Sequence, residues 1–222
     1  MHVVVFGATG MIGHGALLAA LDADDVTTVT AVVRRPLAVR HPKLREVVHD
    51  DFTDYGGVAE RFAGADACFF CLGVSSAGLS EERYTEITRD YPLAAARALA
   101  EVNPRLAFVY VSGAGADPTS GTMWARVKGR AEEDLHATGL RVSAFRPAYI
   151  QPRRGARSAT RAYRLLYGVL GPLYPVLRRL FPRHTTTTDA VGAAMLTVAR
   201  GKVPTPRIAV TAEINHLAAA PA

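Results

Sequence analysis

Two residues near the middle of the chain have the spacing of a catalytic pair. Lys128 follows Trp124 by four positions in the stretch TMWARVKG, and this spacing places both side chains on one face of a helix. A lysine ammonium lowers the pKa of a neighbouring acid, but the indole N–H of Trp124 donates hydrogen bonds without ionising usefully. The pair therefore predicts binding chemistry and leaves the proton donor of any reaction unassigned.

A glycine-rich stretch near the N-terminus predicts a dinucleotide site. The apolar run HVVVF is followed by GATGMIG and then by a helical pattern. Gly7 permits a tight turn, Gly10 lets the backbone approach a pyrophosphate, and Gly13 allows helix and strand to pack closely. The free N–H groups of the helix N-terminus attract phosphates. The predicted contacts of this loop are Gly7, Thr9, Gly10, Met11, Ile12 and Gly13.

The residues after the second predicted strand indicate which dinucleotide binds. An NAD site usually has an acidic residue about 20 positions beyond the glycines, whereas this chain has Arg34 and Arg35. Two guanidinium groups there would pair with the 2′-phosphate of NADP(H). We therefore expect NADP(H) to be preferred over NAD(H), with two solvated arginines at a strand end as the alternative.

Length and composition narrow the class of protein. The 222 residues, 49% of them hydrophobic, are enough for one domain spanning residues 1–222. No apolar run approaches the roughly 18 residues of a membrane-spanning helix, and the chain enters its first strand without a leader, so we expect a cytoplasmic protein. The oligomeric state is left undetermined.

The net charge of +6 is concentrated in one region. No acidic residue occurs between Asp134 and Asp189, while eight arginines fall between residues 153 and 183. A regional excess indicates an anionic ligand or surface near that segment rather than a nucleic-acid partner.

The two cysteines are interpreted as core residues. Cys68 and Cys71 lie in the apolar run ADACFFCLG, which is typical of a buried strand. Residues three apart in a strand point to opposite faces, so the two sulfurs should not meet. We predict neither a disulfide nor a metal site.

The rest of the chain alternates short apolar runs with helical patterns. Strands are expected at the runs HVVVF, VTTVTAVV, REVV, DACFFC, RLAFVYV, RVSAFR and RIAV, and helices include YGGVAERFAG and the long stretch SEERYTEITRDYPLAAARALAEV. Strands that are apolar throughout are buried on both faces. The pattern predicts an α/β fold, a doubly wound, Rossmann-type parallel sheet of six or seven strands with a small helical C-terminal cap.

These motifs together resemble the atypical short-chain dehydrogenases/reductases, in the small epimerase-like or NmrA-like branch that includes relatives of the Tat-interacting protein. The resemblance covers about residues 1–150 and includes the segment FRPAYIQP. It implies that Asp51 and Phe52 lie beside the adenine, and that Leu72 and Gly73 flank the adenosine ribose and the phosphates. The remaining implied roles are Pro147 at the nicotinamide, Ser112 as the catalytic serine and Lys128 as the ligand of the nicotinamide ribose.

The chain departs from the family at the position of the proton donor. An active family member has a tyrosine four residues before the lysine, where this chain has Trp124. Three interpretations stay open: an oxidoreductase or epimerase-like enzyme acting on a small organic molecule, with its proton from Tyr149, Tyr84, water or substrate; a non-catalytic NADP(H) sensor; or a ribose ligand with vestigial chemistry. A serine-hydrolase interpretation of Ser112 fails, because VSGAG lacks the glycine two positions before the serine.

The resemblance implies that residues 151–184 form a substrate cap, with helices broken at Gly171-Pro172 and at Pro175. Its mixture of arginine with Leu, Tyr and Phe is also typical of a helix at a membrane surface or of a partner interface. The cap is the favoured interpretation, and peripheral membrane contact is the less favoured one.

Overall fold

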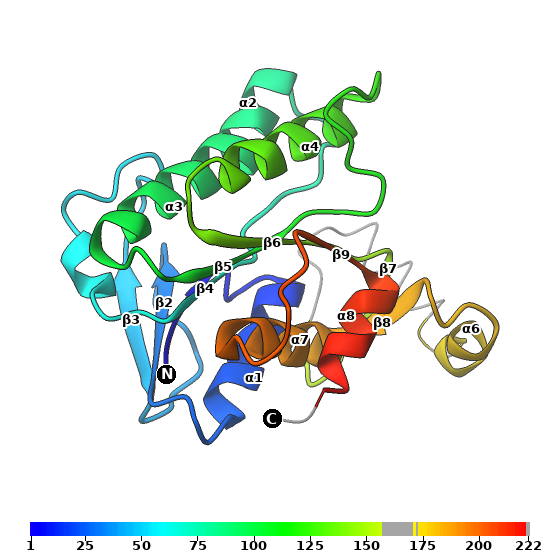
Figure 1. Cartoon of the computed structure of the whole chain (residues 1–222), viewed down its shortest axis with the longest axis horizontal. Helices are drawn as coiled ribbons and strands as arrows, with labels where there is room; N and C mark the ends of the chain where they lie inside the picture. Colours follow the sequence, from blue (N-terminus) through cyan, green and yellow to red (C-terminus); the bar gives the residue numbers. More distant parts are fainter. Residues whose placement is uncertain (157–170, 172, 221–222) are drawn as a thin grey trace.

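A seven-stranded parallel sheet forms the centre of the molecule (Figure 1). The computed structural model describes residues 1–156, 171 and 173–220. The strands of the sheet lie in the order β3-β2-β1-β4-β5-β6-β9. Their bounds are β1 His2–Phe6, β2 Thr28–Val33, β3 Leu44–Val48, β4 Ala67–Phe70, β5 Ala107–Val111, β6 Arg141–Arg146 and β9 Ile208–Val210. All seven predicted strands are confirmed. The chain reverses its direction of winding between β1 and β4, and doubly wound sheets bind their ligands at such a reversal.

Helices cover both faces of the sheet, as burial of its apolar strands requires (Figure 1). One face packs against α1, α7 and α8, and the other against α3 and α4, with α2 at the outer end of that layer. The helices are α1 Met11–Asp22, α2 Glu81–Thr85, α3 Tyr91–Val102, α4 Met123–His136, α7 Thr188–Arg200 and α8 Thr211–Ala218. Each side of the sheet thus has its own hydrophobic core.

Two predicted helices differ from expectation. Residues 55–64 form only the short 3-10 turn Ala59–Phe62, in which Phe62 is fully buried, because two glycines precede the turn and a third, Gly64 with φ 74°, follows it. The long predicted helix after Ser80 is divided, since a π-helical segment Glu86–Asp90 lies between α2 and α3. Such segments insert one residue per turn and often occur near functional sites.

The cysteines lie as predicted. Cys68 is completely buried in the core beneath α3 and α4, and Cys71 packs against the core on the α1 side. Both are free thiols, and burial raises the pKa of each, that of Cys71 to about 12. They are therefore protonated core side chains at neutral pH.

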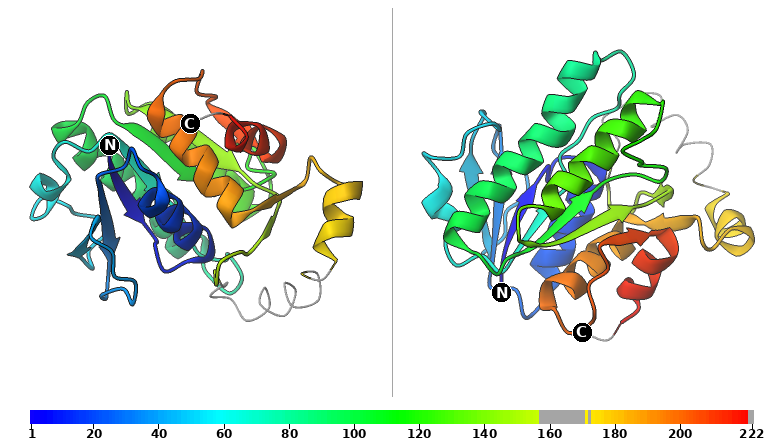
Figure 2. Two further views of the ribbon diagram at one scale, coloured as in Figure 1. Left: turned by 90° about the horizontal axis from the view of Figure 1, so that it is seen from below. Right: turned by 45° about the horizontal axis from the view of Figure 1, so that its top comes forward.

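The described part of residues 151–184 stands beside the main sheet. A second, two-stranded parallel sheet pairs β7 Tyr149–Gln151 with β8 Thr185–Thr187, and helix α6 Tyr174–Leu180 lies at the outer edge (Figure 2). The expected break at Pro175 is wrong, because Pro175 lies in the first turn of α6, where its missing N–H costs no helical hydrogen bond. Pro172 and residues 157–170 lie outside the described residues. Strands as short as β7 and β8 cannot be predicted from the sequence, because three residues are too few to show a periodic pattern.

Candidate cofactor and active site

The predicted site residues follow the carboxyl ends of six neighbouring strands. Because all strands of the main sheet are parallel, these ends meet at one edge. The glycine loop follows β1, Arg34 follows β2, Asp51 lies beyond β3, Leu72 follows β4, Ser112 follows β5, and Pro147 follows β6. The topology therefore gathers into one row residues that are up to 140 positions apart.

The glycine loop is a cradle that side chains would fill. Gly7 has φ +76°, and a Cβ there would lie 2.6 Å from the backbone nitrogen of Leu72. A Cβ on Gly13 would lie 2.0 Å from the carbonyl oxygen of Gly7. The strand, the loop and α1 pack so closely here that only glycine fits at either position.

The N-terminus of α1 is open to an anionic ligand. Gly10 occupies the N-cap position and offers no side-chain acceptor to the first helical N–H groups, and its own N–H donates to Gly7 O at 2.8 Å. Thr9 is exposed, and Met11 and Ile12 are half-buried against the core. The free N–H groups and the positive end of the helix dipole suit a pyrophosphate.

Arg34 and Arg35 extend from the end of β2 beside this loop, since β2 pairs with β1 in parallel register. Both side chains are exposed, and neither forms an ion pair with any residue that the structure describes. Their charges are therefore available to an anion at this edge.

The residues expected at the adenine differ in accessibility. Asp51 is exposed, and Thr53 donates to its carboxylate from both N and Oγ1, which lowers the pKa of Asp51. Phe52 is only 4% exposed and stacks on Tyr91 with ring centroids 5.6 Å apart. Its side chain belongs to the core, so any ligand contact at this position falls to its backbone. Leu72 is half-buried against Gly7, and Gly73 is exposed.

Ser112 and Lys128 come together at the end of β5. The Ser112 backbone N–H donates to Phe145 O, while its hydroxyl is buried without a hydrogen-bond partner among the described residues. The ammonium of Lys128 lies 3.5 Å from Val111 O and 5.7 Å from the centre of the Tyr110 ring. A buried hydroxyl without a partner is costly, and a water molecule or a ligand can complete it.

Desolvation lowers the pKa of Lys128 to about 8, and the carboxylate of Glu132, one turn further along α4, opposes this shift. Glu132 is 3% exposed and accepts two hydrogen bonds from Arg146 Nε, at 2.9 and 3.1 Å. Glu132 was not predicted from the sequence as part of the site, although its position four residues after Lys128 was a usable signal. Lys128 thus shares the single carboxylate of Glu132 with Arg146.

Trp124 lies where the motif predicted, in the first turn of α4. It is half-buried, and a Cβ on Gly115 would lie 3.3 Å from its ring. The loop after Ser112 therefore passes directly over the indole.

The two candidate proton donors occupy different surroundings. Tyr84 is 2% exposed and lies within α2 rather than at its start, close enough to Tyr110 to affect the pKa of that phenol. Tyr149 is half-buried in β7, its hydroxyl donates to Gln151 Oε1 at 2.7 Å, and burial raises its pKa. Tyr149 has the better access to a ligand at the sheet edge. Pro147, two residues before it, is buried and accepts a hydrogen bond from Ala114 in the Ser112 loop.

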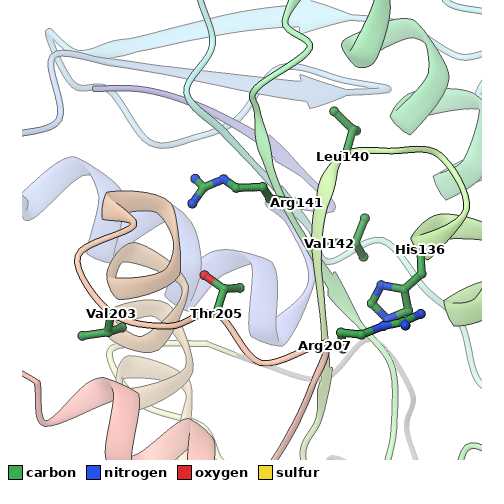
Figure 3. A pocket seen from close by; sticks show the side chains of 7 residues that line it. All are labelled: His136, Leu140, Arg141, Val142, Val203, Thr205 and Arg207. Atoms are coloured by element: carbon green, nitrogen blue, oxygen red, sulfur yellow. The ribbon is translucent and has the colours of Figure 1, made fainter.

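A cavity of about 480 Å³ lies at the opposite edge of the sheet (Figure 3). His136, Arg141 and Arg207 line it, and burial together with Arg207 lowers the pKa of His136. None of the predicted site residues contributes to it.

The fold and the sheet-edge geometry together define a Rossmann-type dinucleotide-binding protein. A model of a family described as NAD(P)H-binding matches residues 7–166, and the chain belongs to this family. The predicted resemblance is confirmed to the extent of an NAD(P)H-binding family, and the curated relatives include a Tat-interacting-protein relative.

Curated relatives agree with this family. The chain is 30% identical over 151 residues to protein HTATIP2 of Rattus norvegicus (67% of this chain, 62% of the relative) and 29% identical over 186 residues to protein fmp52, mitochondrial, of Aspergillus clavatus (80% and 79%). It is 31% identical over 138 residues to leucinostatins biosynthesis cluster protein T of Purpureocillium lilacinum, and this match spans 61% of the chain but only 51% of that relative.

Solved structures show the same fold. The reductase domain of PhqB from Penicillium fellutanum superposes with a TM-score of 0.70 at 15% identity, covering 95% of this chain and 66% of that one. A short-chain dehydrogenase/reductase superfamily protein from Agrobacterium tumefaciens with bound NAD gives 0.69 at 15% identity, covering 95% and 77%. Among the residues that our structure describes, no helix has both the length and the apolar character to cross a bilayer.

Proposed function

We propose that this protein is an NADP(H)-dependent oxidoreductase, or an epimerase-like enzyme, that acts on a small organic molecule. The observation that carries the proposal is the buried hydroxyl of Ser112, which has no partner within the described residues and lies beside Lys128 at the carboxyl edge of the sheet. The residues present fit the cofactor, because the Gly7 and Gly13 cradle and the open N-terminus of α1 suit its pyrophosphate.

The preference for the phosphorylated cofactor is supported by the two arginines after β2. A charge-assisted hydrogen bond from Arg34 or Arg35 to a 2′-phosphate contributes roughly 1.5 to 3 kcal/mol, or about one to two decades of preference over NAD(H).

Each side chain at the Ser112 end has a distinct task. The ammonium of Lys128 donates to ribose hydroxyls and thereby sets the orientation of the nicotinamide, which supplies or accepts hydride when bound. The hydroxyl of Ser112 donates to the carbonyl oxygen of a substrate and polarises it. The indole N–H of Trp124 can add one further hydrogen bond at this face of α4.

Tyr149 is the proton donor that the surroundings favour. Its phenol is protonated at neutral pH and can therefore donate a proton to a substrate, while burial raises its pKa and makes it a weaker acid than a free tyrosine. This protonation state favours the direction of carbonyl reduction. Water or the substrate remains the alternative source.

Trp124 supports a second function, that of a non-catalytic NADP(H) sensor. The position of the family's proton donor is filled by a group that does not ionise, while every element of the binding edge is retained. In that case occupancy of the site, rather than turnover, is what a partner detects.

A fluorescence titration tests the binding claim. Trp124 is the only tryptophan and lies one helical turn from Lys128, so cofactor binding should change its emission. We expect NADPH to bind more tightly than NADH, and failure of both to bind below the millimolar range would overturn the proposal.

A turnover assay then separates enzyme from sensor. NADPH oxidation is followed with a panel of carbonyl compounds, and Ser112→Ala should abolish any activity found. Ser143→Ala is the matched control, because Ser143 is equally buried on the neighbouring strand but donates to Pro206 O. Trp124→Tyr should raise turnover if the missing acid limits the reaction.

We also propose a cytoplasmic location. Because fmp52 relatives are named mitochondrial, fractionation of cells that express the tagged chain is the deciding measurement.

A further inference from the structure

A second cavity lies at the cofactor edge of the molecule, in the region of the predicted cap. It has a volume of about 530 Å³, is partly open to solvent, and is lined by residues of α6, β8, the N-terminus of α7 and α8. Three arginines line it: Arg153, Arg178 and Arg183. α7 places it near the glycine loop, because Thr188 at the start of α7 contacts Gly15 of α1.

These three arginines are not neutralised. None of them forms an ion pair with a described residue, whereas their neighbour Arg154 pairs with Asp22 at 2.6 Å. The residues that the structure does not describe contain no aspartate or glutamate, so they supply no carboxylate side chain either. Asp189 is the only acidic side chain among the lining residues, which leaves an excess of two positive charges. Like charges gathered around one cavity repel each other unless an anion lies between them.

The floor of the cavity is rigid and already hydrogen-bonded. Thr186 donates to Asn215 Oδ1 at 2.7 Å, and Asn215 Nδ2 donates to Thr185 O at 2.9 Å. The backbone N–H of Arg153 donates to Thr188 Oγ1 at 3.0 Å, which anchors this arginine at the start of α7. The neutral polar groups are therefore committed to one another, and the guanidinium groups remain as the donors for a ligand.

A pair of tyrosines connects this cavity with the proposed active site. Tyr174 lines the cavity, and its ring stacks on that of Tyr149 with centroids 6.5 Å apart. The guanidinium of Arg153 lies 6.0 Å from the centre of the same Tyr174 ring. These ring contacts place the cavity next to Tyr149, the proton donor that we propose.

We propose that this cavity binds the anionic group, phosphate or carboxylate, of the substrate. The inference rests on the proposed function and adds a substrate class to it, namely small carbonyl or hydroxyl compounds that carry a negative charge at one end. Arg153, Arg178 and Arg183 determine this specificity and do not take part in the chemistry.

The test uses two probe anions on the intact protein. NADPH binding is first measured by Trp124 fluorescence, and the NADPH-saturated protein is then titrated calorimetrically with inorganic pyrophosphate or with citrate at constant ionic strength. Saturation keeps both anions away from the glycine loop. The stronger of the two probes indicates whether phosphate or carboxylate is preferred.

Variants on α6 and in the segment that follows it identify the binding site. Arg178→Gln and Arg183→Gln should each weaken anion binding by at least about tenfold. Arg179→Gln is the matched control, since Arg179 adjoins Arg178 but does not line the cavity, and it should change binding by less than about twofold. All three variants should bind NADPH as the parent does.

Two results would overturn the inference: no binding of either anion up to about 10 mM, or equal weakening by Arg179→Gln and Arg178→Gln. If the parent protein does not bind NADPH, that result refutes the proposed function instead. In that event the same anion titrations on the cofactor-free protein still decide whether the cavity binds anions.

Discussion

The two ends of the predicted cofactor site are built by different means. At the glycine loop, the backbone itself forms the cradle, and the essential feature of Gly7 and Gly13 is the lack of a side chain. At the end of β5, the backbone only places Ser112 and α4, and the chemistry depends on the side chains of Ser112, Trp124 and Lys128. Binding capacity is therefore tied to the fold, whereas catalytic capacity can change with one residue and leave the fold intact.

This contrast explains how a tryptophan is accommodated at the family's proton-donor position. Trp124 packs beneath the loop at Gly115, in the first turn of a helix whose other residues still hold Lys128 and Glu132. A change at that position alters neither the sheet nor the glycine cradle. The two ends should consequently respond differently to substitution.

The largest effect is expected at the glycine loop. Gly13→Ala places a Cβ 2.0 Å from a backbone carbonyl oxygen, which cannot move cheaply, so the free energy of unfolding should fall by about 3 to 4 kcal/mol. Urea unfolding provides the measurement. Gly57→Ala is the control, because a Cβ there has no atom within 4 Å. Equal stability of the two variants would show that the cradle tolerates side chains.

The next largest effect is expected for the charge network behind Lys128. Glu132→Ala leaves Arg146 half-buried without its partner and should lower the free energy of unfolding by about 2 to 3 kcal/mol. Glu132→Gln, which retains hydrogen-bond acceptors, should cost less. A loss below about 0.5 kcal/mol for the alanine variant would contradict the role of this pair.

The third prediction concerns only the glycine-loop end of the predicted cofactor site, where Arg34 and Arg35 lie. Arg34→Ala together with Arg35→Ala should weaken NADPH binding by about one to two decades and leave NADH binding nearly unchanged, because only NADPH carries the 2′-phosphate. Fluorescence titration of both nucleotides measures the ratio. A parallel loss for the two cofactors would mean that the arginines act nonspecifically.

The smallest expected effect is a pH dependence at Lys128. With its pKa lowered to about 8, Lys128 loses its charge as pH rises through that value, and NADPH affinity should fall by about tenfold. Lys128→Arg should remove this dependence, since arginine stays protonated. Affinity of the parent protein that is constant between pH 7 and 9.5 would contradict a charged ligand role.

The stability of the protein without cofactor should show the opposite trend. Because the folded pKa lies below the ordinary value of 10.5, the unfolded chain binds more protons between pH 8 and 10.5, and this residue's contribution to the free energy of unfolding rises with pH there. Comparison with Lys128→Met isolates the contribution in urea titrations at several pH values.

Much of the fold could be read from local patterns. Apolar runs from HVVVF to RVSAFR predicted the strands because a strand buried on both faces must be apolar throughout. The same reasoning failed for residues 55–64, where the glycines prevented a full helix, and for β7 and β8, which are too short to have a period.

The sequence by itself determined the cofactor motif, the Ser112, Trp124 and Lys128 register and the opposite directions of the two cysteines, because each depends on residues that lie close together in the chain. Only the tertiary structure decided that Phe52 is a core residue, that Glu132 pairs with Arg146, and which arginines line a cavity. These contacts join residues that are distant in the chain, and they arise from the packing of α4 on β6 and from the placement of α6 and α7 beside β8. Local periodicity contains no information about such pairings.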